Sequence, residues 1–208
     1  MNDLIDTLSD DLQPVRPLSL TRGRWLGLGA AAFSVLGFLL LFGLRPDLAA
    51  GRPAPLVLVI VGLFALSAVA AGWAATRLAR PAVGSVNQTG ALWLFAAILV
   101  LPAASAIERA LGHGADMDVA FGLECLSLGL AASLVTAGAL TAFLKRGAPV
   151  LPDKAGLLVG LSAGSVGALA ITLECAGTQL SHLAVWHVGI VALWAALGRW
   201  GIGRMLRW

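Results

Sequence analysis

AGLLVGLSAGSVGALAITLECA, residues 155–176, is the stretch that decides the fold. It carries no charged side chain before Glu174, and it is long enough to cross a bilayer, which takes about 20 apolar residues. Gly156, Gly160 and Gly164 recur at four-residue intervals, so they share one helix face on which a neighbouring backbone can approach closely. We therefore expect this segment to be a membrane-spanning helix at the centre of a helical bundle.

The composition of the whole chain is typical of a membrane protein. Of its 208 residues, 59% are hydrophobic and only 12% are charged, against about 25% charged residues in a soluble domain. The basic residues flank apolar segments and form no patch, which argues against direct binding of nucleic acid. The start does not resemble a secretory signal, because a long polar stretch precedes an apolar run that is itself long enough to span.

The apolar segments predict an all-α membrane protein with six transmembrane helices in a bundle, over residues 25–200. These segments are Trp25–Leu44, Ala54–Ala75, Gly90–Ile107, Val119–Phe143, Ala155–Ala176 and Leu183–Leu197. Positive charge favours the cytoplasmic side. With the N-terminus inside, all 14 Lys and Arg residues except Arg45, Arg52 and Arg109 fall on cytoplasmic segments. We therefore expect both termini in the cytoplasm, with residues 201–208 as a basic tail.

The N-terminal segment, residues 1–24, is predicted to contact a protein. Leu4, Ile5, Leu8 and Leu12 recur at helical spacing with acidic residues between them, which predicts a short amphipathic helix. Helices that lie on membrane surfaces usually have a basic polar face. This one is acidic, so its apolar stripe fits a protein partner better than an anionic bilayer. The alternative is a frayed tail.

Two cysteines form the strongest candidate site, and each follows a glutamate, in the pairs Glu124-Cys125 and Glu174-Cys175. A charge within an apolar helix is costly and is therefore a functional candidate. In the predicted topology Cys125 begins one helix and Cys175 ends the next, so both lie toward the periplasm. Consecutive antiparallel helices are neighbours in a bundle. A disulfide or half of a metal site is thus within reach, and inert packing of buried thiols is the alternative.

Histidines are predicted at the same rim. His182 and His187, together with Glu124 and Glu174, are candidates to tune the thiols. Thiolate, imidazole and carboxylate together suit a soft or borderline divalent metal, with the cysteines as its ligands. The spacing matches no standard zinc pattern, and ordinary loop or interface histidines are the alternative.

The sequence lacks the patterns of common catalytic sites. It has no C-x-x-C, no nucleophile elbow, no phosphate loop and no H-E-x-x-H. These absences argue against the common classes of enzyme. A small membrane thiol oxidoreductase or a metal transporter is one hypothesis that stays open.

Several short features resemble the NrsF-type membrane anti-sigma factors, where NrsF stands for negative regulator of sigma F. They are Asp3-Leu4-Ile5-Asp6-Thr7-Leu8, Leu12-Gln13-Pro14-Val15-Arg16, the six predicted spans, the two cysteines and the closing Arg207-Trp208. The resemblance covers nearly the whole chain. It differs after the second cysteine, where Trp186-His187 replaces an expected Trp-Tyr and Leu180-Ser181-His182-Leu183 lacks an expected Pro near a Phe.

The resemblance implies a regulator of transcription at the bacterial inner membrane and not an enzyme. Such proteins hold an extracytoplasmic-function sigma factor and release it under heavy-metal or oxidative stress. By resemblance, Cys125 and Cys175 are the sensor, and residues 1–24 contact the sigma factor. No resident cofactor is expected, only a transient heavy-metal ion. We expect bridging of the thiols to shift the fourth helix against the fifth along the glycine face.

Overall fold

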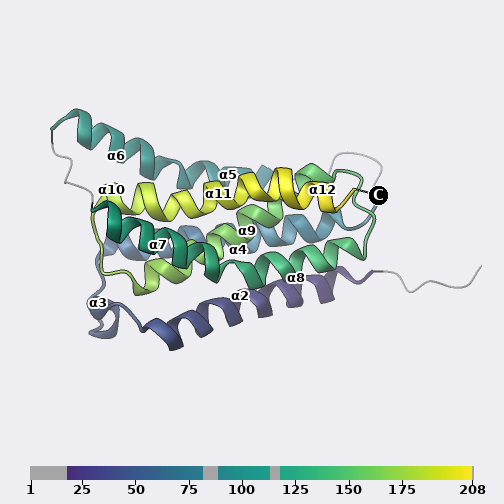
Figure 1. Ribbon diagram of the computed structural model, residues 1–208, viewed down its shortest axis with the longest axis horizontal. Helices are drawn as coiled ribbons and strands as arrows, with labels where there is room; N and C mark the ends of the chain where they lie inside the picture. Colours follow the sequence, from purple (N-terminus) through teal and green to yellow (C-terminus); the bar gives the residue numbers. More distant parts are fainter. Residues whose placement is uncertain (1–17, 82–88, 113–117, 208) are drawn as a thin grey trace, which may run out of the picture.

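The computed structural model describes residues 18–81, 89–112 and 118–207, and these residues form helices and short connections without strands (Figure 1). The apolar stripe predicted within residues 1–24 lies outside them. The longer helices are α2 (Leu20–Phe42), α4 (Pro55–Leu78), α5 (Thr89–Ile98), α6 (Val100–Ala110), α7 (Val119–Ala132), α8 (Leu134–Lys145), α9 (Pro152–Glu174) and α11 (Val188–Leu197). The shorter ones are α3 (Pro46–Ala49), α10 (Leu180–His182), α12 (Gly203–Met205) and the π-helical η1 (Leu183–His187) and η2 (Gly198–Ile202).

Local chemistry determines where several helices begin. The Oγ of Ser19 accepts a hydrogen bond from the N–H of Arg22 at 3.4 Å and caps α2. Asp118 caps α7 in the same way, through the N–H of Phe121 at 3.1 Å. Proline stands at the start of α4 and α9, where its missing N–H would have no helical partner in any case.

Five helical stretches in the described parts of the chain are long and apolar enough to cross a membrane. They are Leu20–Phe42, Pro55–Leu78, Val119–Lys145, Pro152–Glu174 and Leu180–Met205. The remaining predicted span, Gly90–Ile107, is divided between α5 and α6, neither of which is long enough by itself. Pro102 explains the division, because it has no N–H for the carbonyl of Ile98 and its ring crowds that carbonyl. Figure 1 shows α6 turned away from the direction of α5.

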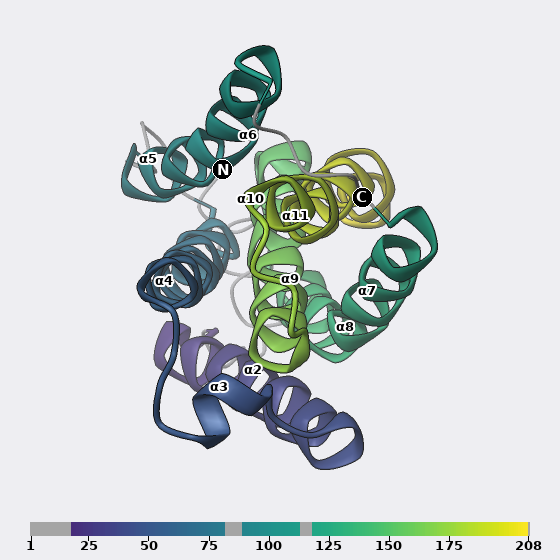
Figure 2. The same cartoon turned by 90° about the vertical axis from the view of Figure 1, so that its left-hand side faces the viewer.

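Helix α9 lies at the centre of the bundle, as the sequence predicts. Figure 2 shows it surrounded by α2, α4, α7, α8 and α11, and most of its side chains are buried. A Cβ added to Gly160 would lie 2.0 Å from the carbonyl oxygen of Trp194, and one added to Gly156 would lie 2.2 Å from that of Gly198. The glycine face therefore contacts α11 and η2.

The fourth predicted helix contacts α9 elsewhere, which corrects the expected direction of movement. A Cβ added to Gly167 would lie 2.1 Å from the carbonyl oxygen of Gly129 in α7. Near this contact the hydroxyl of Ser133 donates to the Gly129 carbonyl at 2.8 Å, and the stretch is interrupted between α7 and α8. Such back-bonding bends helices. A shift along the glycine face would thus move α9 against the last helical stretch and not against the fourth.

The two ends of the bundle differ in charge. The thiol end comprises α3, the ends of α6 and α9, the start of α7, and α10. The basic end comprises the starts of α2 and α9, the ends of α4 and α8, and α12. There Arg80 donates to the carbonyl of Leu18 at 3.0 Å, and Arg207 pairs with Asp153 at 2.9 Å. The orientation of these ends in a membrane stays a prediction.

Candidate functional site

Four buried side chains meet at the thiol end. Cys125 comes from α7, Cys175 follows the last residue of α9, His182 belongs to α10 and His187 to η1. Taking one sulfur or nitrogen atom from each, these potential metal ligands all lie within 4.8 Å of one another. The structure thus brings together both predicted thiols and both predicted histidines, and we call these four residues the thiol–imidazole cluster.

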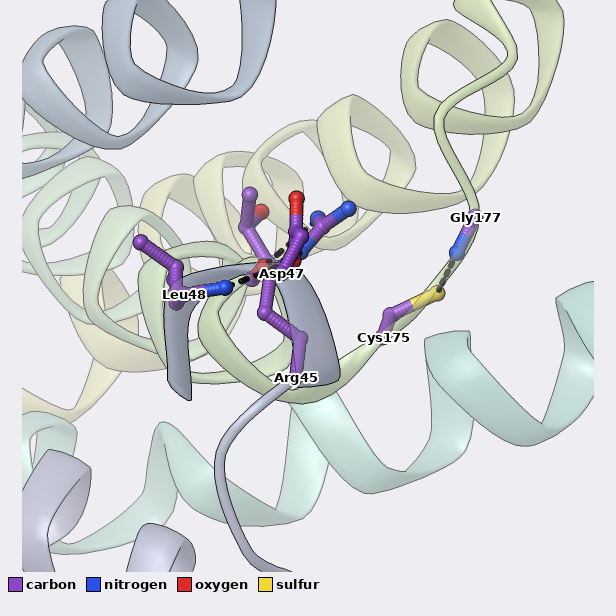
Figure 3. A network of polar contacts seen from close by, with 6 residues as sticks. Arg45, Asp47, Leu48, Cys175 and Gly177 are labelled. Atoms are coloured by element: carbon purple, nitrogen blue, oxygen red, sulfur yellow. Dashed lines mark hydrogen bonds and ion pairs between the residues drawn. The ribbon is translucent and has the colours of Figure 1, made fainter. Parts of the chain in front are cut away.

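The two thiols are close but not bonded. Their sulfur atoms are 3.6 Å apart, and both cysteines are free, since a disulfide bond measures about 2.05 Å. The packing of α7 on α9 through Gly129 and Gly167 brings the two helices near enough for this approach. The Sγ of Cys175 also accepts a hydrogen bond from the N–H of Gly177 at 3.4 Å (Figure 3). Both thiols are therefore placed to share a ligand or to form a bond.

The sulfur of Cys175 makes most of the contacts within the cluster. It accepts a hydrogen bond from the Cys125 thiol at 3.6 Å and one from the N–H of Gly177 at 3.4 Å. The Nε2 of His182 lies 3.5 Å from the same sulfur. Cys175 thus connects α7, α9 and α10 within the cluster.

The π-helical turn η1 directs both histidines to the cluster. His182 and His187 are five residues apart, and in an α-helix of 3.6 residues per turn such residues lie on different faces. In a π-helix the hydrogen bond joins residues i and i+5, so residues at this spacing lie about one turn apart on the same side. The two rings accordingly meet edge to face, with centroids 5.2 Å apart.

Thr172 determines which nitrogen of His187 faces the cluster. The Thr172 hydroxyl donates its proton to the carbonyl of Ala168 at 2.6 Å, so toward His187 it acts as an acceptor. The Nδ1 of His187, 2.8 Å away, therefore carries the proton. The Nε2 is left with a free lone pair, and it is buried without a hydrogen-bond partner. A neighbour that fixes the tautomer in this way is typical of metal-binding histidines.

Arg45 contacts the end of α9 that leads to Cys175. It is 1% exposed and forms an ion pair with Asp47 at 2.5 Å. Its Nη1 donates to the carbonyl of Thr172 at 3.3 Å, and its own N–H donates to that of Leu173 at 2.9 Å. Figure 3 shows this network beside the end of α9 that leads to Cys175. A cation is favourable here, because it lies at the negative end of the α9 dipole.

The predicted glutamates lie outside the thiol–imidazole cluster. Glu124 is exposed and Glu174 is half-buried. Neither belongs to the group of potential ligand atoms that the described residues form.

A surface cavity leads to the cluster. It is lined by residues of the α7 start and of the connection between α9 and α10, namely Asp118, Phe121, Ala176, Gly177, Thr178, Gln179 and His182. Most of these residues are exposed, whereas His182 is buried, so the cavity runs from the surface to one imidazole. The Phe121 ring stacks on that imidazole at 5.1 Å.

Comparison with known proteins identifies the family. The family described as "Negative regulator of sigma F", NrsF, matches residues 8–208. The chain belongs to the NrsF family. It is 31% identical over its whole length to "Anti-sigma-F factor NrsF" of Caulobacter vibrioides (strain NA1000 / CB15N), of which the alignment covers 99%. It is 29% identical to "Probable anti-sigma-F factor NrsF" of Azospira oryzae (strain ATCC BAA-33 / DSM 13638 / PS), with 99% of this chain and 98% of that protein covered. No solved structure matches the chain.

Several residues of this NrsF chain act at the site without a clear signal in the sequence. Arg45 reads as an ordinary loop arginine, and Thr172 as one polar residue within an apolar helix. Phe121 reads as an ordinary apolar residue near the start of a helix, whereas the acidic Asp118 falls in the loop that the sequence places at the same rim. The sequence Arg45-Pro46-Asp47 does carry one usable signal, since an opposite charge two residues away allows a local ion pair. Nothing in it indicates that this pair reaches the end of α9.

Proposed function

We propose that this NrsF-family chain is an inner-membrane anti-sigma factor that sequesters an extracytoplasmic-function sigma factor. It releases this partner when Cys125 and Cys175 react with a heavy metal or an oxidant. Two relatives that align over nearly their full length are named "Anti-sigma-F factor NrsF" and "Probable anti-sigma-F factor NrsF". These names support a sigma factor as the partner. Five apolar helices long enough to cross a membrane support a membrane location. The sigma factor would contact the cytoplasmic face, including Leu4, Ile5, Leu8 and Leu12.

The observation that carries the sensor proposal is the approach of the two thiols to 3.6 Å within a buried cluster. The chain has only these two cysteines, and they are fifty residues apart in sequence. A metal can bridge the sulfur atoms with little movement. Alternatively, an oxidant can take two electrons and two protons from the thiols as the disulfide forms. In that case the sulfur atoms must approach by more than 1 Å, to about 2.05 Å.

The elements around the cluster provide a route to the opposite end. Helix α9 runs from Cys175 to the basic end, and the stretch that begins with α10 and η1 continues through α11 and η2 to α12. These two elements touch along the glycine face, where backbones are in contact. Packed interfaces switch between discrete arrangements. A change at the thiols would therefore alter how α9 packs against the stretch from α10 to α12. Release requires that the two arrangements differ in affinity for the sigma factor.

A membrane thiol oxidoreductase or a metal transporter is the competing function, because adjacent thiols beside a surface cavity also suit those activities. A transporter usually has charged or broken helices near the middle of the membrane. Here Glu124 and Glu174 lie at one end of their helices. Turnover of a quinone, or uptake of metal into vesicles, would separate these activities from regulation.

A reporter gene driven by the promoter of the cognate sigma factor tests the sensor. We expect Cys125→Ser and Cys175→Ser each to retain repression but to lose the response to cadmium and to oxidant. The double variant should be no worse than either single one, because one lost thiol already prevents the bridge. Glu124→Gln and Glu174→Gln should change only the dose required, since neither carboxylate joins the cluster.

Co-purification of the sigma factor with the membrane protein provides the second measurement. The wild-type protein should retain its partner without stress and lose it after exposure, while both serine variants retain it throughout. A normal response in both serine variants would show that the thiols only pack. Absence of any bound sigma factor from the unstressed protein would contradict the anti-sigma function itself.

A further inference from the structure

We infer that Cys125, Cys175, His182 and His187 together form a four-coordinate site for a thiophilic divalent cation of the zinc and cadmium class. The site would be reached through the cavity beside α10. The inference rests on the proposed function for its regulatory meaning and deepens it by naming the ligand set. It assigns the two histidines as ligands in their own right, where the proposed function requires only the thiols.

Two distances within the cluster match a tetrahedral metal site, and all four potential ligand atoms lie within 4.8 Å of one another. Zinc binds cysteine sulfur at about 2.3 Å and histidine nitrogen at about 2.0–2.1 Å. The edge of a tetrahedron is about 1.6 times its centre-to-corner distance, so two sulfurs should lie about 3.8 Å apart and a sulfur and a nitrogen about 3.6 Å apart. The observed distances are 3.6 Å between the sulfurs and 3.5 Å between Cys175 Sγ and His182 Nε2.

His187 provides an independent observation that points to a ligand. Its side chain is fully buried and its Nε2 has no hydrogen-bond partner. A buried polar atom without a partner is uncommon, because it loses its hydration without compensation. Thr172 holds the ring in the tautomer whose free lone pair is on this atom. A metal ion at the centre of the cluster would satisfy the lone pair.

Charge balance favours a divalent ion with this ligand set. Binding releases two thiol protons to solvent and leaves two thiolates, two neutral imidazoles and one doubly positive ion, which sum to zero. A neutral centre avoids the high cost of burying a net charge. Carboxylates of Glu124 or Glu174 are not needed and would make the centre negative. The soft sulfur pair selects ions of the zinc and cadmium class over magnesium or calcium.

The cavity supplies an access route of suitable chemistry. The Asp118 carboxylate and the polar residues Thr178 and Gln179 line it, and His182 forms its inner wall. A hydrated cation could exchange water for these oxygen atoms before reaching the imidazole. The buried Arg45 at this end of α9 is occupied by Asp47 and by the Thr172 carbonyl. A cation that enters the cavity thus meets the carboxylate of Asp118 on its way to His182.

Direct metal binding to the full-length protein in detergent tests the ligand set. The protein is reduced, freed of metal and titrated with Co²⁺, whose visible spectrum reports tetrahedral thiolate ligation, and the ion is then displaced with Cd²⁺. We expect one ion per chain. His182→Asn and His187→Asn should each weaken binding by at least about 10- to 100-fold, the usual cost of losing even an outer partner of a metal ligand. Ser127→Ala, at an exposed position of α7 two residues after Cys125, is the matched control and should bind as wild type, because this hydroxyl donates only to the carbonyl of Glu124.

X-ray absorption on the Cd²⁺-loaded wild-type protein gives a result independent of any variant. Two sulfur and two nitrogen neighbours are expected. Sulfur-only coordination, or histidine variants with wild-type affinity and spectrum, would overturn the inference. So would a reduced protein that binds no Co²⁺ or Cd²⁺. Sigma retention is measured separately on the same samples, so a protein that binds the ion through four ligands yet keeps its partner would contradict the proposed function and leave the site intact.

Discussion

At the scale of single residues, Thr172 links the core of α9 to the thiol–imidazole cluster. Thr172→Val keeps the shape of the side chain but removes the acceptor for the Nδ1–H of His187. The ring then has no fixed tautomer, and we expect Cd²⁺ affinity to fall by about 10- to 100-fold. Competition of Cd²⁺ against Co²⁺ in the purified protein measures the effect. Ser165→Ala is the control, since this buried hydroxyl of the same helix has no hydrogen-bond partner. Equal affinities for both variants would contradict the role of Thr172.

Arg45 stabilises the connection between α2 and α4 on the end of α9. Arg45→Met leaves the carbonyl of the buried Thr172 without its charged donor, a loss of about 1.5–3 kcal/mol in unfolding free energy. The midpoint of thermal unfolding in detergent should therefore fall. Arg52→Met, in the same connection but exposed, should leave the midpoint nearly unchanged. A similar drop in both variants would show that the loss of positive charge, and not the contact with α9, is responsible.

The pH dependence of this contact follows from Asp47. Its hydrogen bond and ion pair with Arg45 lower the pKa of the Asp47 carboxyl below the ordinary value of 3.8. A lowered pKa means that the stabilisation is fully present above the ordinary value and is lost as the pH falls through the folded-state value. The difference in midpoint between wild type and Arg45→Met should thus be constant from about pH 8 to pH 5 and shrink only below about pH 4. A difference that disappears near pH 6 would assign the effect to another group.

The residues of the site divide into those that sequence can predict and those that it cannot. Cys125 and Cys175 follow from topology alone, because one begins and the other ends consecutive helices. The fact that His182 and His187 point in the same direction could not be predicted. Residues five positions apart lie on the same face of a helix only if that helix is a π-helix. The roles of Arg45 and Thr172 could not be predicted either. They depend on the contact between the end of α9 and the connection from α2 to α4, which only the structure shows.

At the scale of elements, the glycine face of α9 determines how closely the last helical stretch packs. Gly160→Ala places a Cβ 2.0 Å from the backbone oxygen of Trp194, which cannot move aside as a side chain can. Overpacking of this kind typically costs about 1–3 kcal/mol, so the unfolding midpoint in detergent should fall. Gly138→Ala in α8 meets nothing within 4 Å. It should be neutral or stabilising, because alanine favours a helix by roughly 0.5–1 kcal/mol over glycine. A drop of equal size in both would contradict close packing at Gly160.

The sequence predicts the presence of these helices well, because the length of an apolar segment determines it. It predicts less well which helices are neighbours, because side-chain and backbone packing determines that. The spacing of glycines correctly marks α9 as central, yet it does not tell which neighbour occupies the face. That neighbour is α11 with η2, because α7 approaches through Gly129 and Gly167 instead. The third segment is apolar along its length, and its division into α5 and α6 follows from one proline whose effect on a spanning segment depends on its neighbours.

At the scale of the whole molecule, the arrangement of the helices bears on the number of crossings. Helix α4 ends at the basic end, and α7 begins at the thiol end. The pair α5 and α6 must therefore lead from one end of the bundle to the other, although neither helix is long enough by itself. Counting this pair as one kinked crossing gives an even number, so the C-terminus returns to the side where α2 begins.

Reporter fusions test the crossing number and the orientation together. Because the basic end favours the cytoplasm, a cytoplasm-active reporter after Trp208 should be active and a periplasm-active one silent. A fusion after Arg52, which follows a single crossing, should show the reverse. If Arg52 and Trp208 both report the periplasm, α5 and α6 do not cross, and the number of crossings is odd. If Arg52 reports the cytoplasm and Trp208 the periplasm, the orientation is inverted, and the thiol–imidazole cluster would lie on the cytoplasmic side, where glutathione keeps thiols reduced. Because α3 and the connection that holds Arg52 lie at the thiol end, a periplasmic Arg52 is the result that places the thiols where metal ions and oxidants arrive from outside the cell.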